Sequence, residues 1–275
     1  MHFFRPESKM SVADLPRFRG NRGGIIPMHR ALARLTFGAS EMLMSVTTAA
    51  LITVAWLWCL SRVCEYWKVV FRVGGQMLRL ADALKTSVHH FGFGLTLPVP
   101  YFEFEPLMPT SHLWAAACVA VLAIFALTFL LPPKFIPLVY LLRCVLFVQV
   151  SALVYFAVFP AQFPYAPADY LQGLLLSGAA LIGAVPLLFL LTYYIFPFSV
   201  VKKLFLTLLT MGYLAVFLPF QLMLHAVILR ASILFMPVLY LVLGMPLDVL
   251  IIVAFYAWGM TWFFTGDRLR PTLPQ

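Results

Sequence analysis

The chain of 275 residues is 63% hydrophobic and 11% charged, and it carries a formal net charge of +9. Soluble domains usually contain about 25% charged residues, and a chain of this length cannot bury so much apolar surface in a soluble fold. The composition therefore excludes a soluble globular protein. It predicts an all-α, polytopic integral membrane bundle of about six spans, with five or seven as alternatives.

Residues 1–40 form a basic arm before the first apolar stretch. The arm carries seven basic and two acidic residues, namely Arg5, Lys9, Arg17, Arg19, Arg22, Arg30, Arg34, Glu7 and Asp14. A basic flank favours retention on the cytoplasmic side, and it attracts anionic lipid headgroups. Nucleic acid is not an expected partner, because the arm lacks the interleaved aromatic residues of a single-strand platform. The arm is too polar for a cleavable signal peptide, so the first apolar stretch is expected to act as an uncleaved signal anchor.

Residues 41–61 contain the first predicted transmembrane helix, Glu41–Leu60, which has roughly the 20 apolar residues that a bilayer requires. An amphipathic helix is predicted next, over Arg62–His90, where an apolar stripe recurs at steps of four and three from Val63 onward. We expect this helix to lie in the membrane interface, with a coiled-coil seam as the alternative. The pair Gly74-Gly75 is expected to divide it.

The segment Pro98–His112 contains four prolines, which exclude a regular helix. If its central residues are extended, the two phenylalanines face one side and the two glutamates the other; these residues are Tyr101, Phe102, Glu103, Phe104 and Glu105. The pattern predicts an interfacial strap with the phenylalanines in the headgroup layer. The alternative is an acidic, aromatic surface that contacts a partner or a cation. Residues 62–112 are thus interpreted as one interfacial region.

Residues 113–264 form the main bundle in this interpretation. Four spans are predicted, at Leu113–Leu131, Phe135–Phe159, Tyr170–Phe196 and Leu204–Leu229. The last apolar stretch, Ala231–Phe264, has a length of about 51 Å as one helix, which exceeds the roughly 30 Å hydrocarbon core. Because Gly244-Met245-Pro246 divides it, either a re-entrant half-helix precedes a span from Leu247, or one tilted helix bends at Pro246. Residues 265–275 form a short polar tail.

The basic residues of the short loops predict the orientation. With the N-terminus inside, Lys134, Lys202 and Lys203 all lie on the cytoplasmic side of a six-span bundle. The loop Pro160–Asp169, which has no basic residue, then lies outside. We therefore predict a multi-pass protein of a bacterial inner membrane with a cytoplasmic N-terminus.

A few polar side chains fall inside the predicted spans, where charge is costly and raises a functional question. Gln221 and His225 are four residues apart and share one helix face. Asp248 lies either in the first turn of the last span or near mid-bilayer. Together with Gln149 and Arg230, these residues form a candidate intramembrane polar site. The structural alternative is hydrogen bonding between helices.

The sequence shows no catalytic motif, no glycine-rich phosphate loop and no zinc-type spacing of cysteine and histidine. No catalytic, cofactor-binding or metal-ligating residue is assigned, and no cofactor is expected. The preferred function is a non-catalytic subunit, an anchor or scaffold that contacts the lipid bilayer and other membrane subunits. The second is a small transporter or channel with a polar path near Gln221, His225 and Asp248. The third is a lipid-acting membrane enzyme with His225 and Asp248 as an acid–base pair, which requires a separation of about 3 Å.

Overall fold

The computed structural model describes residues 18–19, 25–26, 39–90, 96–105, 107–159, 163–193 and 200–268. Within these residues, six helical segments are long and apolar enough to cross a bilayer. The predicted all-α membrane bundle is therefore confirmed, with six spans. Most of the predicted N-terminal arm, and the tail beyond Arg268, lie outside the described residues.

The elements follow one another as the hydropathy indicates, except in the region before the second span. The helices are α1 (Ala39–Met77), α2 (Ser111–Leu130), α3 (Ile136–Val158), α4 (Pro167–Tyr193), α5 (Val200–Ala231), α6 (Met236–Leu243) and α7 (Met245–Arg268). Short 3-10 segments are η3 (Ala81–Ala83), η5 (Pro133–Phe135) and η7 (Ile233–Phe235). The strands are β1 (Phe18–Arg19) and β2 (Ile25–Ile26), which pair antiparallel, and β3 (Leu84–His90) and β4 (Thr96–Phe102).

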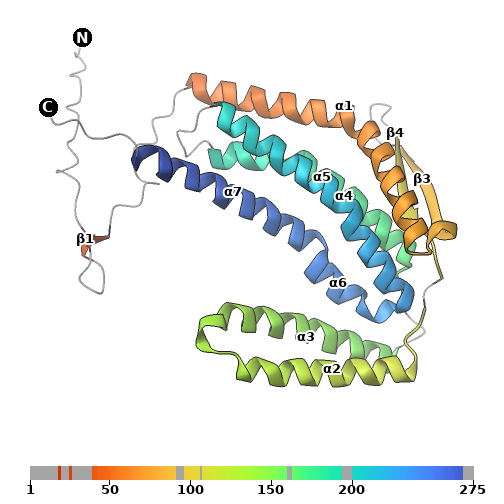
Figure 1. The fold of residues 1–275 in the computed structure, drawn as a ribbon. Coiled ribbons are helices and arrows are strands. Elements are labelled where there is room, and N and C mark those ends of the chain that lie inside the picture. Colours follow the sequence, from red (N-terminus) through yellow and green to blue (C-terminus); the bar gives the residue numbers. More distant parts are fainter. Residues whose placement is uncertain are drawn as a thin grey trace, which may run out of the picture.

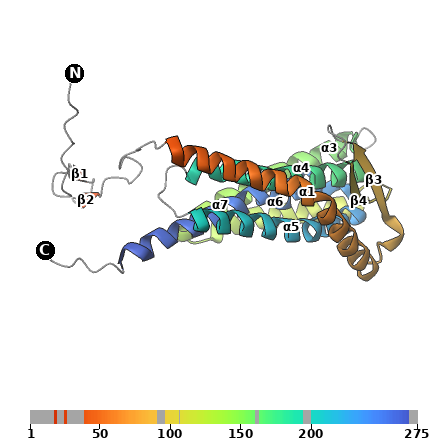
Figure 2. The same ribbon diagram turned by 90° about the horizontal axis from the view of Figure 1, so that it is seen from above.

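Successive spans run in opposite directions through the bundle (Figure 1). The start of α1, the turn between α2 and α3, the start of α5 and the end of α7 lie at one end of the molecule, and the β3–β4 hairpin lies at the other end (Figures 1 and 2). Both ends of the helical region therefore lie on the same side, as an even number of crossings requires.

The first helix is longer than the sequence indicates. α1 continues without interruption from Ala39 to Met77, so the prediction of a separate interfacial helix over Arg62–His90 is wrong in its extent. Its ribbon bends in the second half (Figures 1 and 2). The amphipathic period is present, but its buried positions are Leu60, Cys64, Trp67 and Phe71. This face packs on α4, α5 and β4 instead of lying in the headgroup layer.

A left-handed residue ends α1. Arg79 has φ 56°, the amide of Leu80 donates to the carbonyl of Gly75 at 2.7 Å, and the amide of Arg79 donates to that of Gln76 at 3.3 Å. These two bonds form a Schellman motif, which satisfies the last carbonyls of a helix. The pair Gly74-Gly75 therefore does not divide the helix, contrary to the prediction; the helix ends three residues later.

The first part of the strap predicted over Pro98–His112, up to Phe102, belongs to one strand of a hairpin. β3 and β4 pair antiparallel in the register Leu84↔Phe102 to His90↔Thr96, so the predicted helix over residues 84–90 is wrong. The prolines of β4 are tolerated because a two-stranded sheet leaves each strand with an unpaired edge. Ser87 Oγ donates to Gln172 Oε1 at 3.1 Å, and His89 Nε2 lies 3.2 Å from the same oxygen, which ties the hairpin to α4.

The bundle contains two hydrophobic cores. The first unites α1, β4, α4, α5, α6 and α7, and the second lies within the α2–α3 hairpin and η7. The hairpin stands apart from α1, α4 and α5 in Figure 1. α3 joins it to the rest through α6 and η7. In η7, Ile233 and Leu234 are completely buried, and the Ile233 amide donates to the Leu107 carbonyl at 3.2 Å.

The last apolar stretch is divided at Gly244, as predicted from the sequence Gly-Met-Pro. α6 ends at Leu243 and α7 begins at Met245. The two helices continue in the same general direction (Figure 1). This arrangement corresponds to the bent helix of the two alternatives rather than to a re-entrant half-helix, and it puts the break inside the bundle.

Candidate functional site: a polar cluster at a helix break

The break between α6 and α7 interrupts the backbone hydrogen bonds of the last span. The amide of Leu247 donates to the carbonyl of Gly244 at 3.0 Å, so the Leu243 carbonyl lacks the amide four residues on that a regular helix supplies. In a bilayer, an unsatisfied carbonyl costs several kcal/mol, on the order of the penalty for burying any polar group without a partner. The break therefore requires donors from a neighbouring helix.

Gln221 of α5 supplies those donors. Its Nε2 donates to the carbonyl of Leu243 and, at 3.3 Å, to that of Gly244. Because both partners are acceptors, the amide nitrogen must face them, and the orientation of the group follows from the network. Its Oε1 is left as a buried acceptor without a hydrogen-bond partner among the described residues. Gln221 thus satisfies the break and presents an oxygen beside it.

His225, one turn further along α5, contacts backbone carbonyls through both ring nitrogens. Nδ1 lies 2.8 Å from the Gln221 carbonyl and Nε2 lies 3.3 Å from the Leu239 carbonyl. A neutral imidazole has one N–H, so it donates to only one of the two. The side chain is completely buried. Neither nitrogen is hydrogen-bonded to Asp248 in the described part of the chain.

Asp248 lies in the first turn of α7, where a carboxylate suits the helix dipole. Its side chain is 2% exposed. The Gln221 side chain is the polar group beside it, yet neither carboxyl oxygen has a hydrogen-bond partner in the described part of the chain. An ionised carboxylate without a partner is strongly disfavoured in an apolar interior. The group therefore requires a proton or a cation.

Tyr170 of α4 is a member of the cluster that the sequence did not reveal. Its ring centroid lies 5.8 Å from that of His225, and its hydroxyl is buried without a partner among the described residues. In the sequence, Tyr170 marks the end of a span, where tyrosine is common in the interfacial belt. Nothing in the pattern distinguishes it from such a residue.

The two other predicted site residues lie elsewhere. Gln149 is buried on the face of α3 that belongs to the second core, and neither atom of its amide has a hydrogen-bond partner among the described residues. Arg230 is exposed, and its Nη1 donates to the Arg79 carbonyl at 2.7 Å. It therefore holds the end of α1 and does not neutralise Asp248. Of the five candidates, Gln221, His225 and Asp248 converge.

The predicted strap turns its aromatic side chains inward. Phe102 is 1% exposed and packs edge-on against Phe71, with ring centroids 5.2 Å apart. Phe104 packs partly buried on the same core, so the predicted position of the two rings in the headgroup layer is wrong. Glu103 forms an ion pair with Lys85, the β3 residue that pairs with Tyr101 of β4. Glu105 is exposed.

The ion pair shifts the titration of the lysine. The Glu103 carboxylate accepts a hydrogen bond from the Lys85 ammonium and thereby raises the pKa of Lys85 above its ordinary value. Both side chains are solvent-exposed, so the pair contributes little to the stability of the hairpin. The acidic face of the strap is thus the part that remains open to solvent.

The cluster contains buried acceptor atoms that have no hydrogen-bond donor among the described residues. The Gln221 side chain lies beside the Asp248 carboxyl, and Gln221 Oε1 and both carboxyl oxygens are buried without a hydrogen-bond partner among the described residues. Within the described residues, no group of three or more His, Cys, Asp or Glu side chains could hold a metal ion. The arrangement suits a proton on Asp248 or a small monovalent cation at its carboxyl.

Searches of the chain against models of protein families, against curated proteins and against solved structures found no match.

Proposed function

We propose that the chain is a small integral membrane transporter that binds a proton or a monovalent cation at Asp248. The observation that carries the proposal is the Asp248 carboxyl, 2% exposed, with no hydrogen-bond partner among the described residues for either oxygen. Ionisable groups at membrane depth commonly mark ion pathways and proton relays. If this position served only for packing, leucine or asparagine would fill it at a lower free-energy cost than a buried carboxyl.

The broken helix supports the same function. Transporters often place their ion sites where a spanning helix is interrupted near the bilayer midplane, because loosened carbonyls and helix ends then face the ion. Here the interruption at Gly244 lies next to Asp248 and is bridged by Gln221. The low exposure of all three polar side chains corresponds to a site closed to water.

The first experiment tests binding in detergent. Sodium or potassium chloride is expected to raise the unfolding temperature of the wild type relative to choline chloride if an alkali ion occupies the site. If a proton occupies it, these salts have no effect, and the infrared carbonyl stretch of a protonated carboxyl disappears in Asp248→Asn. Asp169→Asn is the matched control, because Asp169 also lies in the first turn of a helix but is exposed.

The second experiment tests transport. In proteoliposomes, imposed proton, sodium or potassium gradients are expected to dissipate at least about tenfold faster with the wild type than with Asp248→Asn, whereas Asp169→Asn retains the wild-type rate. Equal rates for the wild type and Asp248→Asn refute the transport function. A carboxyl that is ionised and insensitive to alkali ions refutes the site itself.

A non-catalytic membrane subunit is the second candidate, favoured by the α2–α3 hairpin. α2 buries Ala117, Val121 and Thr128 within the chain, and the hairpin is attached to the rest of the bundle through the contacts of α3 with η7 and α6. A hairpin of this kind can pack against other membrane subunits. The open acidic face of the strap, formed by Glu103 and Glu105, can contact the same subunits. Co-purification in a mild detergent tests it: stoichiometric partners support a subunit, and a chain that always isolates alone argues against one.

We also propose a cytoplasmic N-terminus and a bacterial inner membrane. The arrangement supports the orientation, because Lys134 and Lys203 lie at the same end of the bundle as the start of α1, and positive charge favours the cytoplasmic side. The basic arm before α1 is then available to anionic lipid headgroups. Labelling of single cysteines at Lys134 and Tyr165 with a membrane-impermeant reagent in intact cells tests the orientation.

A further inference from the structure

A continuous groove runs between α1 and α5 on the lipid-facing side of the first core. Its first part is lined by the start of α1, by Pro186 and Leu190 of α4, and by Lys203 to Thr207 of α5. Its second part continues between Leu51–Val63 of α1 and Leu204–Ala215 of α5. The two parts share Ile52 and Leu204, so they form one groove.

Small residues keep the groove open. Ala55 of α1 and Gly212 and Ala215 of α5 lie along its second part. A Cβ atom added at Gly212 would meet no atom within 4 Å. An unfilled apolar space inside a membrane loses the dispersion contacts of its walls, so hydrocarbon is expected to enter it.

The length of the groove matches one leaflet. Leu204 and Ala215 are eleven residues apart on α5, which corresponds to about 17 Å along the helix. Half of the hydrocarbon core of a bilayer measures about 15 Å. A single acyl chain therefore fills the groove from its polar end to the middle of the membrane.

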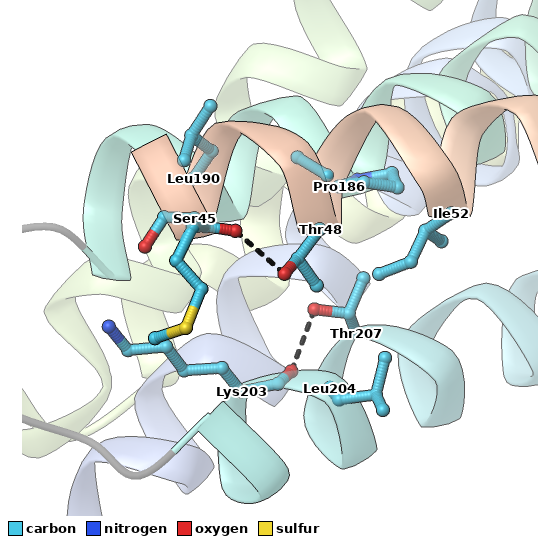
Figure 3. A pocket seen from close by; sticks show the side chains of 10 residues that line it. Ser45, Thr48, Ile52, Pro186, Leu190, Lys203, Leu204 and Thr207 are labelled. Carbon is cyan, nitrogen blue, oxygen red and sulfur yellow. Dashed lines mark hydrogen bonds between the residues drawn. The ribbon is translucent and has the colours of Figure 1, made fainter. Parts of the chain in front are cut away.

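Polar groups line only the end of the groove near the start of α1 and α5. Figure 3 shows Lys203, Ser45, Thr48 and Thr207 around this end, with the Lys203 ammonium on the same side as the Ser45 hydroxyl. Thr48 Oγ1 donates to the Met44 carbonyl at 2.7 Å, and Thr207 Oγ1 donates to the Lys203 carbonyl at 2.8 Å. The helix backbone uses both of these hydroxyl protons. The positive charge at this end is that of the Lys203 ammonium.

We infer that the groove binds one anionic phospholipid, with an acyl chain between α1 and α5 and the phosphate at Lys203. The charge of the end, the apolar walls and the length each correspond to a part of this ligand. A neutral phospholipid fills the walls equally well but gains less from the lysine. The site is independent of Asp248, which lies in another part of the bundle.

The test fills the groove without disturbing the packing. Gly212→Leu places a side chain in the open space of the groove, and Gly173→Leu is the matched control, because a Cβ at Gly173 of α4 also meets no atom within 4 Å and Gly173 lines neither part of the groove. Each protein is placed in nanodiscs with equal amounts of phosphatidylglycerol and phosphatidylcholine and is then extracted into detergent. Native mass spectrometry of the extracted protein is expected to show one retained phosphatidylglycerol on the wild type and on Gly173→Leu. Gly212→Leu is expected to retain at least about fivefold less.

The headgroup is tested separately with Lys203→Gln, which leaves the walls intact. This variant is expected to retain lipid but to lose the preference for phosphatidylglycerol over phosphatidylcholine. If Gly212→Leu does not fold, quenching of Trp56, which lines the groove, by brominated phosphatidylglycerol replaces it, with Trp56→Phe to isolate its signal. Equal retention by Gly212→Leu and the wild type, no lipid on the wild type, or no headgroup preference in the wild type each overturn the inference.

Discussion

The substitution Gly244→Ala tests whether the break between α6 and α7 depends on a missing side chain. A Cβ at this position would overlap the carbonyl oxygen of Tyr240 and lie 3.0 Å from its carbonyl carbon. These are backbone atoms of the preceding turn, so no rotamer change relieves the overlap. Overpacking of this kind costs about 1–3 kcal/mol.

The break can respond in one other way, by straightening. A regular helix through residue 244 would pair the Leu243 carbonyl with the Leu247 amide, which now donates to Gly244. The Gln221 amide would then lose the acceptors that it now has at Leu243 and Gly244. Either response lowers the free energy of unfolding, and the second also displaces the Gln221 side chain that lies beside Asp248.

The assay is unfolding by sodium dodecyl sulfate in mixed micelles, followed by circular dichroism. Gly173→Ala is the control, since its Cβ meets no atom within 4 Å and alanine is favoured over glycine in a helix by about 1 kcal/mol. The control is expected to be unchanged or slightly more stable, and Gly244→Ala to be less stable by about 1–3 kcal/mol. A Gly244→Ala protein as stable as the control would refute the steric account of the break.

Three further predictions concern other features of the fold. Arg79→Gly is expected to raise the free energy of unfolding by about 1 kcal/mol, because φ 56° disfavours a residue with a Cβ and the contact to Arg230 uses only the Arg79 carbonyl; an unchanged or lower stability in the same micelle titration contradicts this. Gln149→Leu is expected to stabilise by about 1–3 kcal/mol, since its buried amide has no partner among the described residues; a loss of stability would reveal a partner. Because Glu103 raises the pKa of Lys85, the stabilisation by this pair is present below the ordinary lysine pKa of about 10.4 and is lost as the pH rises above it. The wild type is therefore expected to lose more stability than Lys85→Gln between about pH 9 and pH 12, and equal losses count against the pair.

The membrane spans could be predicted from the sequence because the bilayer imposes one solution on long apolar segments. A spanning chain must satisfy its own backbone, so an apolar stretch of sufficient length becomes a helix whatever its neighbours are. The division at Gly244-Met245-Pro246 could also be predicted, because proline lacks the amide N–H that a continuous helix requires and glycine has a low helix propensity. The shared face of Gln221 and His225 follows from their spacing alone.

The region between the first two spans could not be predicted in the same way. Residues 62–77 extend α1 because Cys64, Trp67 and Phe71 have α4, α5 and β4 to pack on, and no local signal distinguishes that face from one that lies on lipid. Residues 84–102 form a hairpin although β4 contains prolines, which a sheet of more strands would not accept at its centre. The inward position of Phe102 depends on Phe71, 31 positions earlier in the chain.

The candidate site shows the same division between sequence and structure. The sequence by itself determined that a few polar side chains lie in the membrane, because their positions within apolar helices are countable along the chain. Only the tertiary structure decided their roles: Gln221 satisfies a broken backbone, Arg230 caps a distant helix end, and Asp248 is left without a partner among the described residues. Hydropathy depends on each residue and its neighbours in sequence, whereas the energy of a buried polar group depends on which atoms other helices bring within about 3 Å of it.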